Sequence, residues 1–93
     1  MFKKKKSINL SYVKQGYIAF LCYTLELRKG SEKEEVINLC KDIAGEDWKA
    51  LYEVLTNPYK NLERIARDYF MWERRLSLWR ACFFETYVKR IFR

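Results

Sequence analysis

Histidine is absent from the sequence, and its 93 residues include only one proline and three glycines. Without histidine the chain lacks the commonest general base and the usual activating partner of a serine or cysteine nucleophile. So little proline and glycine leaves few of the tight turns that join short β-strands. These absences argue against an enzyme and against an all-β architecture, and we predict no catalytic residue.

Cysteine is sparse as well: Cys22, Cys40 and Cys82 stand far apart and form no CxxC pair. Structural zinc sites are normally built from closely spaced ligand pairs, so we predict no metal site and no cofactor. An odd number of separated cysteines on apolar helical stripes favours reduced, buried thiols, as in cytoplasmic proteins. The eleven uncharged residues of Gln15–Leu25 are too few to span a bilayer, and no signal-peptide cleavage site follows them.

What the sequence does contain favours helices. Hydrophobic residues make up 49% of the chain and aromatic residues 17%, enough for a packed core, and Lys, Arg, Glu and Leu are abundant. We predict an all-α fold with a basic flexible arm at 1–7 and a single helical domain at 8–93. Apolar residues at helical spacing predict a compact bundle of about five helices at 10–28, 32–44, 47–56, 58–69 and 73–92.

Local signals set the expected helix ends. Gly30 is predicted to stop the first helix, and Ser31 with Glu34 has the spacing of a capping box that would start the second. Gly45 would end the second helix. Before the fourth helix, Asn57 is the expected cap and Pro58 the expected first helical residue.

The first helix is apolar nearly all round, which is typical of a central core helix. Its predicted inward face carries Val13, Tyr17, Phe20, Leu21 and Thr24, widened by Ile18, Cys22 and Leu25.

Two architectures are open for the stretch Leu62–Arg80. One continuous helix from 58 to 92 would carry Trp72 on a coiled-coil-like seam of alternating three- and four-residue steps. Alternatively, the chain turns at Phe70–Trp72 and a second helix starts at Glu73. We prefer the second interpretation, which makes a helix-turn-helix at 58–80.

The same stretch resembles the helix-turn-helix of DNA-binding regulators over about a fifth of the chain. The matching residues are the Ile65-Ala66 pair on the first helix, Tyr69 at its buried end, Met71 in the turn, Glu73-Arg74-Arg75-Leu76 at the opening of the second helix, and Trp79 inward. Two positions depart from the family pattern: Phe70 stands where glycine is preferred, and Trp72 stands where a capping serine is usual. The resemblance implies double-stranded DNA as the partner.

In this interpretation the second helix would read bases with Glu73, Arg74, Ser77 and Leu78, with Ala81 also on the outward side. Arg74 would pair with guanine, Glu73 with cytosine, and Ser77 or Leu78 would meet a base edge or a thymine methyl. Phosphate contacts are expected from Lys60, Arg64, Arg75, Arg80 and the arm residues Lys3, Lys4, Lys5 and Lys6. The plainer alternative is that these arginines form an ordinary solvated face.

Charge supports a polyanionic partner. Residues 57–93 hold nine Lys/Arg against four Asp/Glu, whereas residues 7–56 hold six against eight. Positive charge at both ends suits a nucleic acid, and charge alone does not separate DNA from RNA. We expect no membrane partner, because the apolar faces are needed for the core.

The last helix carries more apolar residues than a small monomer is expected to cover. Those residues are Phe83, Phe84, Tyr87, Val88, Ile91 and Phe92, and they are predicted to form an oligomer or partner contact. The predicted function is a small helix-turn-helix DNA-binding protein, a transcriptional regulator of a phage, plasmid or other mobile element, with a homodimer as its expected form. The alternative is a helical protein-binding module or inhibitor, for example of a nucleic-acid-handling enzyme, that uses this aromatic helix.

Overall fold

Five α-helices build the part of the chain that the computed structural model describes, residues 10–28 and 30–91. They are α1 (Tyr12–Tyr23), α2 (Gly30–Ala44), α3 (Trp48–Thr56), α4 (Leu62–Asp68) and α5 (Glu73–Ile91), with short 3₁₀ helices at η1 (Leu25–Leu27) and η2 (Gly45–Asp47). No strand occurs within these two ranges. The predicted all-α class and the approximate number of helices are confirmed, whereas the predicted arm at 1–7 lies outside the described residues.

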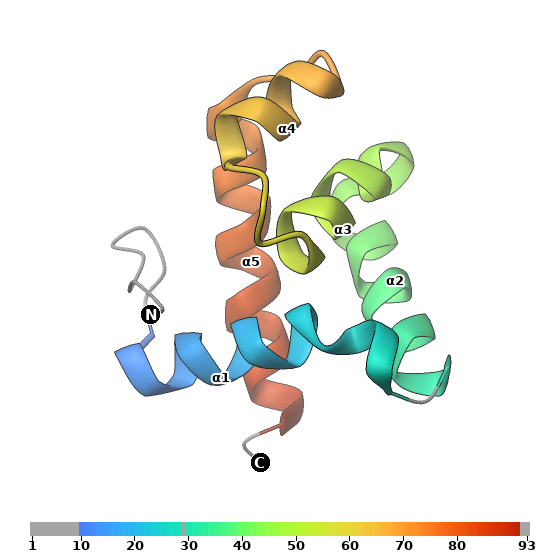
Figure 1. Cartoon of the computed structure of the whole chain (residues 1–93), viewed down its shortest axis with the longest axis vertical. Helices are drawn as coiled ribbons and strands as arrows, with labels where there is room; N and C mark the ends of the chain where they lie inside the picture. Colours follow the sequence, from blue (N-terminus) through green and yellow to red (C-terminus); the bar gives the residue numbers. More distant parts are fainter. Residues whose placement is uncertain (1–9, 29, 92–93) are drawn as a thin grey trace.

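The longest of these helices, α5, is in contact with each of the other four. In Figure 1 it runs along the long axis of the molecule, with α1 crossing it in the lower half, α2 and α3 on one side, and α4 at the upper end. None of the described helices combines the length and apolar character that crossing a bilayer requires.

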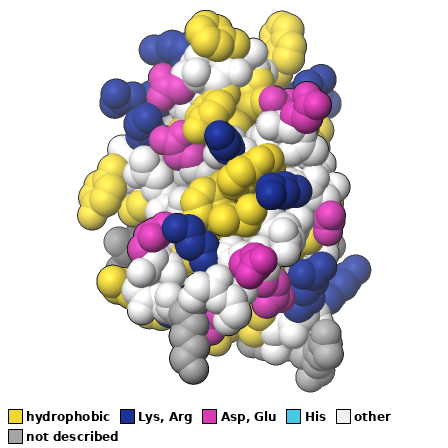
Figure 2. Space-filling model, turned by 90° about the vertical axis from the view of Figure 1, so that its right-hand side faces the viewer, with side chains coloured by type: hydrophobic (Ala, Val, Ile, Leu, Met, Phe, Trp, Pro, Cys, Tyr) yellow, Lys and Arg dark blue, Asp and Glu magenta, His cyan; other side chains and the backbone are white. Residues whose placement is uncertain are grey.

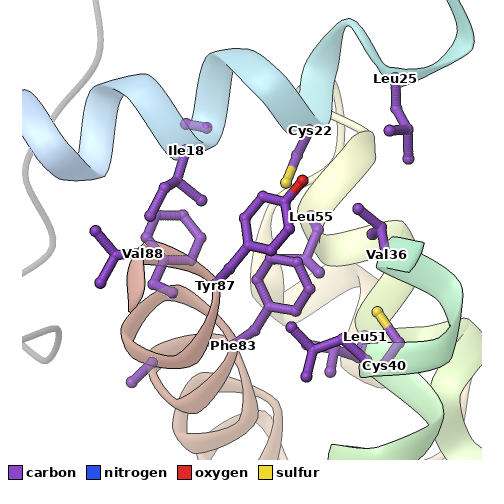
Figure 3. Close-up of a cluster of buried hydrophobic side chains, with 14 residues drawn as sticks. Ile18, Cys22, Leu25, Val36, Cys40, Leu51, Leu55, Phe83, Tyr87 and Val88 are labelled. Carbon is purple, nitrogen blue, oxygen red and sulfur yellow. The ribbon is translucent and has the colours of Figure 1, made fainter. Parts of the chain in front are cut away.

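The larger core cluster lies where α1 crosses α5. Figure 3 shows the rings of Phe83 and Tyr87 directed from α5 toward Ile18 and Cys22 of α1, with Leu51 of α3 beside them. The two rings are stacked with centroids 5.1 Å apart. Full burial of such side chains is the main driving force for closing this part of the fold.

A smaller cluster joins α3, α4 and α5. Its buried members are Ala50, Ile65, Ala66 and Leu76, with Val54, Leu62, Met71 and Trp79 packed against them. Ala66 is 3% exposed, and its small side chain allows the short α4 to approach its neighbours closely. This cluster sets the angle at which α4 meets α5.

The predicted inward face of α1 is wrong for Val13, Tyr17 and Phe20, which are exposed, whereas Ile18, Cys22 and Leu25, predicted to widen that face, are buried. Val13 is 75% exposed and Phe20 61%, whereas the buried side is formed by Gln15, Ile18, Ala19 and Cys22. A helix that is apolar all round can bury either side, and here packing against α5 selects the side with Ile18 and Cys22. Gln15 is accommodated because its Nε2 donates a hydrogen bond to the carbonyl of Leu10 at 3.1 Å.

Two helix boundaries differ from the prediction near Gly30. The helix α1 ends at Tyr23, and the chain then tightens into η1. The Thr24 hydroxyl donates to the Phe20 carbonyl at 2.8 Å at this junction. Gly30 is the first residue of α2 instead of the stop of α1, so Ser31 lies inside the helix. At the other end Gly45 has φ +60° and closes α2, as predicted.

The fourth helix starts at Leu62 instead of Pro58. Asn61 caps it, since its Oδ1 accepts from the Arg64 amide at 2.8 Å. Asn57 instead accepts from the Tyr59 amide at 3.0 Å and forms a turn in the connection. Both asparagines have the right chemistry for a cap, but only Asn61 immediately precedes the apolar repeat that packs on α5.

Candidate nucleic-acid interface

A turn of four residues, 69–72, separates α4 from α5. Phe70 has φ +53°, the left-handed conformation, and its amide donates to the Arg67 carbonyl at 3.2 Å. A residue in this conformation ends a helix. The alternative of one continuous helix from 58 to 92 is therefore wrong.

The start of α5 is fixed by backbone and core contacts. The Trp72 carbonyl accepts from the amides of Arg75 at 3.1 Å and Leu76 at 3.3 Å. The Leu76 side chain is fully buried, whereas the Trp72 side chain is 79% exposed. Trp72 therefore does not continue a buried seam; the indole stands in solvent at the position before the helix.

Three of the residues predicted to contact bases are exposed on α5: Glu73, Arg74 and Leu78. Arg74 and Leu78 are four residues apart and share a helical face. Ser77 is half-buried beside this face. Ala81 is only 8% exposed and packs in the larger cluster, so its predicted outward position is wrong.

The residues predicted to contact phosphate fall into different environments. Arg64 and Arg75 are exposed, and the Arg75 guanidinium lies 5.9 Å from the centre of the Trp79 ring. Lys60 instead places its Nζ 3.2 Å from Glu53 and 3.0 Å from Asp68. Hydrogen bonds to Asp68 and Glu53 raise the pKa of Lys60 and so keep the ammonium protonated, and the two carboxylates balance its charge within the protein.

Arg80 does not join the other arginines. It is half-buried on another side of α5, where burial lowers its pKa while Tyr23 and Glu73 act in the opposite direction. The predicted phosphate contacts Lys3, Lys4, Lys5 and Lys6 lie outside the described residues.

The predicted partner contact on the last helix is largely core. Phe83, Phe84, Tyr87 and Val88 are between 0% and 7% exposed, because α1, α2 and α3 cover this side of α5. Ile91 is half-buried against the same cluster, and Phe92 lies outside the described residues. The apolar side chains that suggested a dimer contact therefore pack within the core of the monomer.

An exposed aromatic group at the turn replaces that predicted surface. Phe70 is 96% exposed, Trp72 79% and Tyr69 39%, so the predicted burial of Tyr69 is also wrong. At this end of the molecule Figure 2 shows hydrophobic side chains standing out among charged ones. The sequence signal for this group was the density of aromatic residues over 69–72, too many for one buried helical face.

Metal chemistry finds no support in the described ranges, where no three His, Cys, Asp or Glu side chains gather in a suitable group. Cys22 and Cys40 are buried, as predicted, but Cys82 is exposed on α5. Its position four residues after Leu78 puts it on the solvent stripe of the helix.

No protein-family model matches this chain, and neither a curated protein nor a solved structure matches it. The candidate site is therefore defined by its own geometry. Arg64, Arg74 and Arg75 expose positive charge and N–H donors, which suit phosphate oxygens and the acceptor edge of guanine. Glu63, Asp68 and Glu73 are exposed in the same region, so its charge is mixed.

Proposed function

We propose that this protein binds double-stranded DNA through α4, the turn and the first turns of α5, and acts in the cytoplasm as a transcriptional regulator of a phage, plasmid or other mobile element. The observation that carries the proposal is the break at Phe70, which leaves Arg74 and Leu78 exposed together at the start of a long helix. A helix presented in this way is the element that helix-turn-helix proteins insert into the major groove.

The state of the arginines supports a polyanionic partner. Within the described ranges, neither Arg64 nor Arg74 forms an ion pair, and Arg75 meets only the face of Trp79. Their charge is available to an incoming phosphate at no cost of breaking an internal pair. Arg67 differs, because its guanidinium lies 3.0 Å from Glu63.

Duplex DNA fits this geometry better than duplex RNA. The major groove of B-form DNA is wide enough for an α-helix, whereas that of A-form RNA is too narrow for side chains to read. An RNA hairpin of matched length is therefore the appropriate competitor in a binding experiment.

The testing experiment measures binding of the purified protein to a fluorescent random-sequence DNA duplex across a salt series. We expect the affinity to fall steeply with salt because bound phosphates release counterions. The double variant Arg74→Ala/Arg75→Ala should bind about tenfold more weakly or worse at low salt. Selection of a specific operator from a random pool would follow.

A matched control is available on the same helix. Lys89→Ala/Arg90→Ala removes the same formal charge from the far end of α5, where both residues are exposed and the Arg90 guanidinium lies 3.7 Å from Glu35. This variant should keep most of the DNA affinity. Equal losses of DNA affinity in the two double variants would mean that binding depends only on the net charge of the protein. Undetectable binding by the wild type at low salt would exclude the proposal.

A second candidate function is recognition of a protein, favoured by the exposure of Phe70 and Trp72. On binding, aromatic side chains of this kind bury about 150–250 Å² each. Such residues are frequent among those whose truncation to alanine costs the most binding free energy in protein interfaces. A second copy of the chain is one such partner. Sedimentation of the wild type and of Phe70→Ala/Trp72→Ala at micromolar concentration tests this, because a monomeric mass for the wild type excludes a stable homodimer.

A further inference from the structure

Arg80 lines a pocket of about 680 Å³ in the described part of the chain. The pocket lies between α1, the 57–61 connection, α4 and α5. In Figure 1 this connection passes in front of α5 between α3 and α4. Its volume falls within the range of about 300–1,000 Å³ that is usual for small-molecule sites.

The Arg80 guanidinium is an incompletely satisfied cation in this pocket. Its Nε is buried without a hydrogen-bond partner, and no carboxylate lies within 4.0 Å of it in the described ranges. The covered Nε is out of reach of a ligand, whereas the two terminal nitrogens of the guanidinium are not buried, so an anion in the pocket pairs with those nitrogens. The other cation of the lining, Lys60, is already held by Glu53 and Asp68.

Two amide groups add donors to the same wall. The Oδ1 of Asn57 accepts from Tyr59, and the Oδ1 of Asn61 accepts from Arg64. In both residues the side-chain oxygen is used as an acceptor, so the Nδ2 group is the part of the amide that can donate to a ligand. The pocket therefore offers donors from three residues of its lining: Arg80, Asn57 and Asn61.

The remaining lining limits the charge and the shape of a ligand. Glu63 and Glu73 also line the pocket, and Glu73 forms no ion pair within the described ranges. Their negative charge disfavours a phosphate dianion relative to a singly charged group. Ala19, Leu55 and Phe84 also belong to the lining and provide apolar surface for a hydrocarbon or an aromatic ring.

We propose that this pocket binds a small organic monocarboxylate, whose carboxylate pairs with Arg80 and whose apolar part lies against Ala19, Leu55 and Phe84. Arg80 lies about 120° from Arg74 around the axis of α5, so the cation of the pocket is not one of the arginines proposed to bind DNA, although Glu63 and Glu73 of the lining belong to α4 and to the first turn of α5. Binding to the pocket is tested without DNA, so failure of one proposal leaves the other unaffected.

The experiment titrates ¹⁵N-labelled full-length protein with benzoate and follows the Nε–Hε resonance of Arg80 and the side-chain amides of Asn57 and Asn61. We expect saturable shifts with a dissociation constant on the order of 1 mM, which is usual for a probe of this size. Benzyl alcohol, which has the ring without the charge, should produce no saturable shift. Phenyl phosphate should bind more weakly than benzoate because of Glu73.

Arg80→Gln should weaken benzoate binding about tenfold or more, whereas Arg74→Gln removes an exposed arginine from another face and should leave it unchanged. Helical circular dichroism checks that both variants fold. If Arg80→Gln does not fold, the wild-type Arg80 resonance still decides the matter. An absence of saturable shift there, equal binding by Arg80→Gln, or tighter binding of phenyl phosphate would overturn the proposal.

Discussion

The backbone amide of Met71 donates a hydrogen bond to the carbonyl of Ala66 at 2.9 Å, across the turn that ends α4. Together with the bond from the Phe70 amide to the Arg67 carbonyl, it completes a Schellman motif around the left-handed Phe70. The Met71 and Ala66 side chains belong to the same small core cluster. The turn is therefore stabilised both by backbone hydrogen bonds and by side-chain packing.

This motif predicts that Phe70→Gly stabilises the protein. Glycine adopts positive φ without the steric cost that a side chain imposes, and the Phe70 ring is 96% exposed, so little packing is lost. We expect a gain of about 0.5–1 kcal/mol in the free energy of unfolding, measured by urea denaturation. Phe70→Ala removes the ring but keeps the strain, so an equal gain in that variant would contradict the explanation.

The internal ion pairs of Lys60 predict a difference between two basic residues in DNA binding. Arg64→Gln should lower the salt dependence of binding by about one phosphate contact. Lys60→Gln should leave that slope unchanged, because Glu53 and Asp68 already neutralise the ammonium group. The measurement is the slope of log affinity against log salt concentration for each variant, and a smaller slope in Lys60→Gln would show that the ion pairs open on binding.

Burial predicts unequal reactivity of the three cysteines. A thiol reagent should modify Cys82 quickly in the native protein and reach Cys22 and Cys40 only on unfolding. Mass spectrometry of the native and urea-unfolded protein after brief labelling should show one and three modified thiols respectively. Rapid triple labelling without denaturant would mean that the larger core opens readily.

The two buried thiols also predict a loss of stability in alkaline solution. Burial raises the pKa of Cys22 and of Cys40 from 9.0 to about 12. Since the folded pKa lies above the unfolded one, this contribution is complete below pH 9 and is lost as the pH rises toward 12. By pH 10 the loss is on the order of 1 kcal/mol per thiol.

Urea denaturation at pH 8 and pH 10 measures this loss. The double variant Cys22→Ala/Cys40→Ala is less stable at both pH values because it leaves cavities, but its stability should change less between them. Parallel changes in the wild type and the variant would assign the alkaline loss to other groups.

Sequence patterns predicted the second helix well because only one of its sides is apolar. Val36, Leu39 and Cys40 form a stripe that can face only the core, and all three are buried. In α1 the same reasoning failed, since Phe20 and Ile18 are equally apolar and only the position of α5 decides between them. Periodicity identifies an inward face where the opposite face is polar.

The candidate site was predictable in part for the same reason. Local spacing was compatible with a turn at Phe70 and with one continuous helix, and the preferred turn is the one observed. The different environments of Lys60, Arg74 and Arg80 depend instead on side chains distant in sequence. Lys60 meets Asp68 and Glu53 only because α3 and α4 are folded together. Whether a surface charge is paired within the protein or available to a partner depends on tertiary contacts, which a short sequence motif does not specify.

Trp79 packs against both core clusters, so neither cluster can loosen without exposing part of the same indole. Within the described ranges, this shared side chain ties α4 and the start of α5 to the helices that cross below them. The relative orientation of α4 and α5 is therefore expected to be fixed, and the turn between them is not expected to act as a hinge. For the proposed DNA binding, we therefore expect little loss of conformational entropy in this segment.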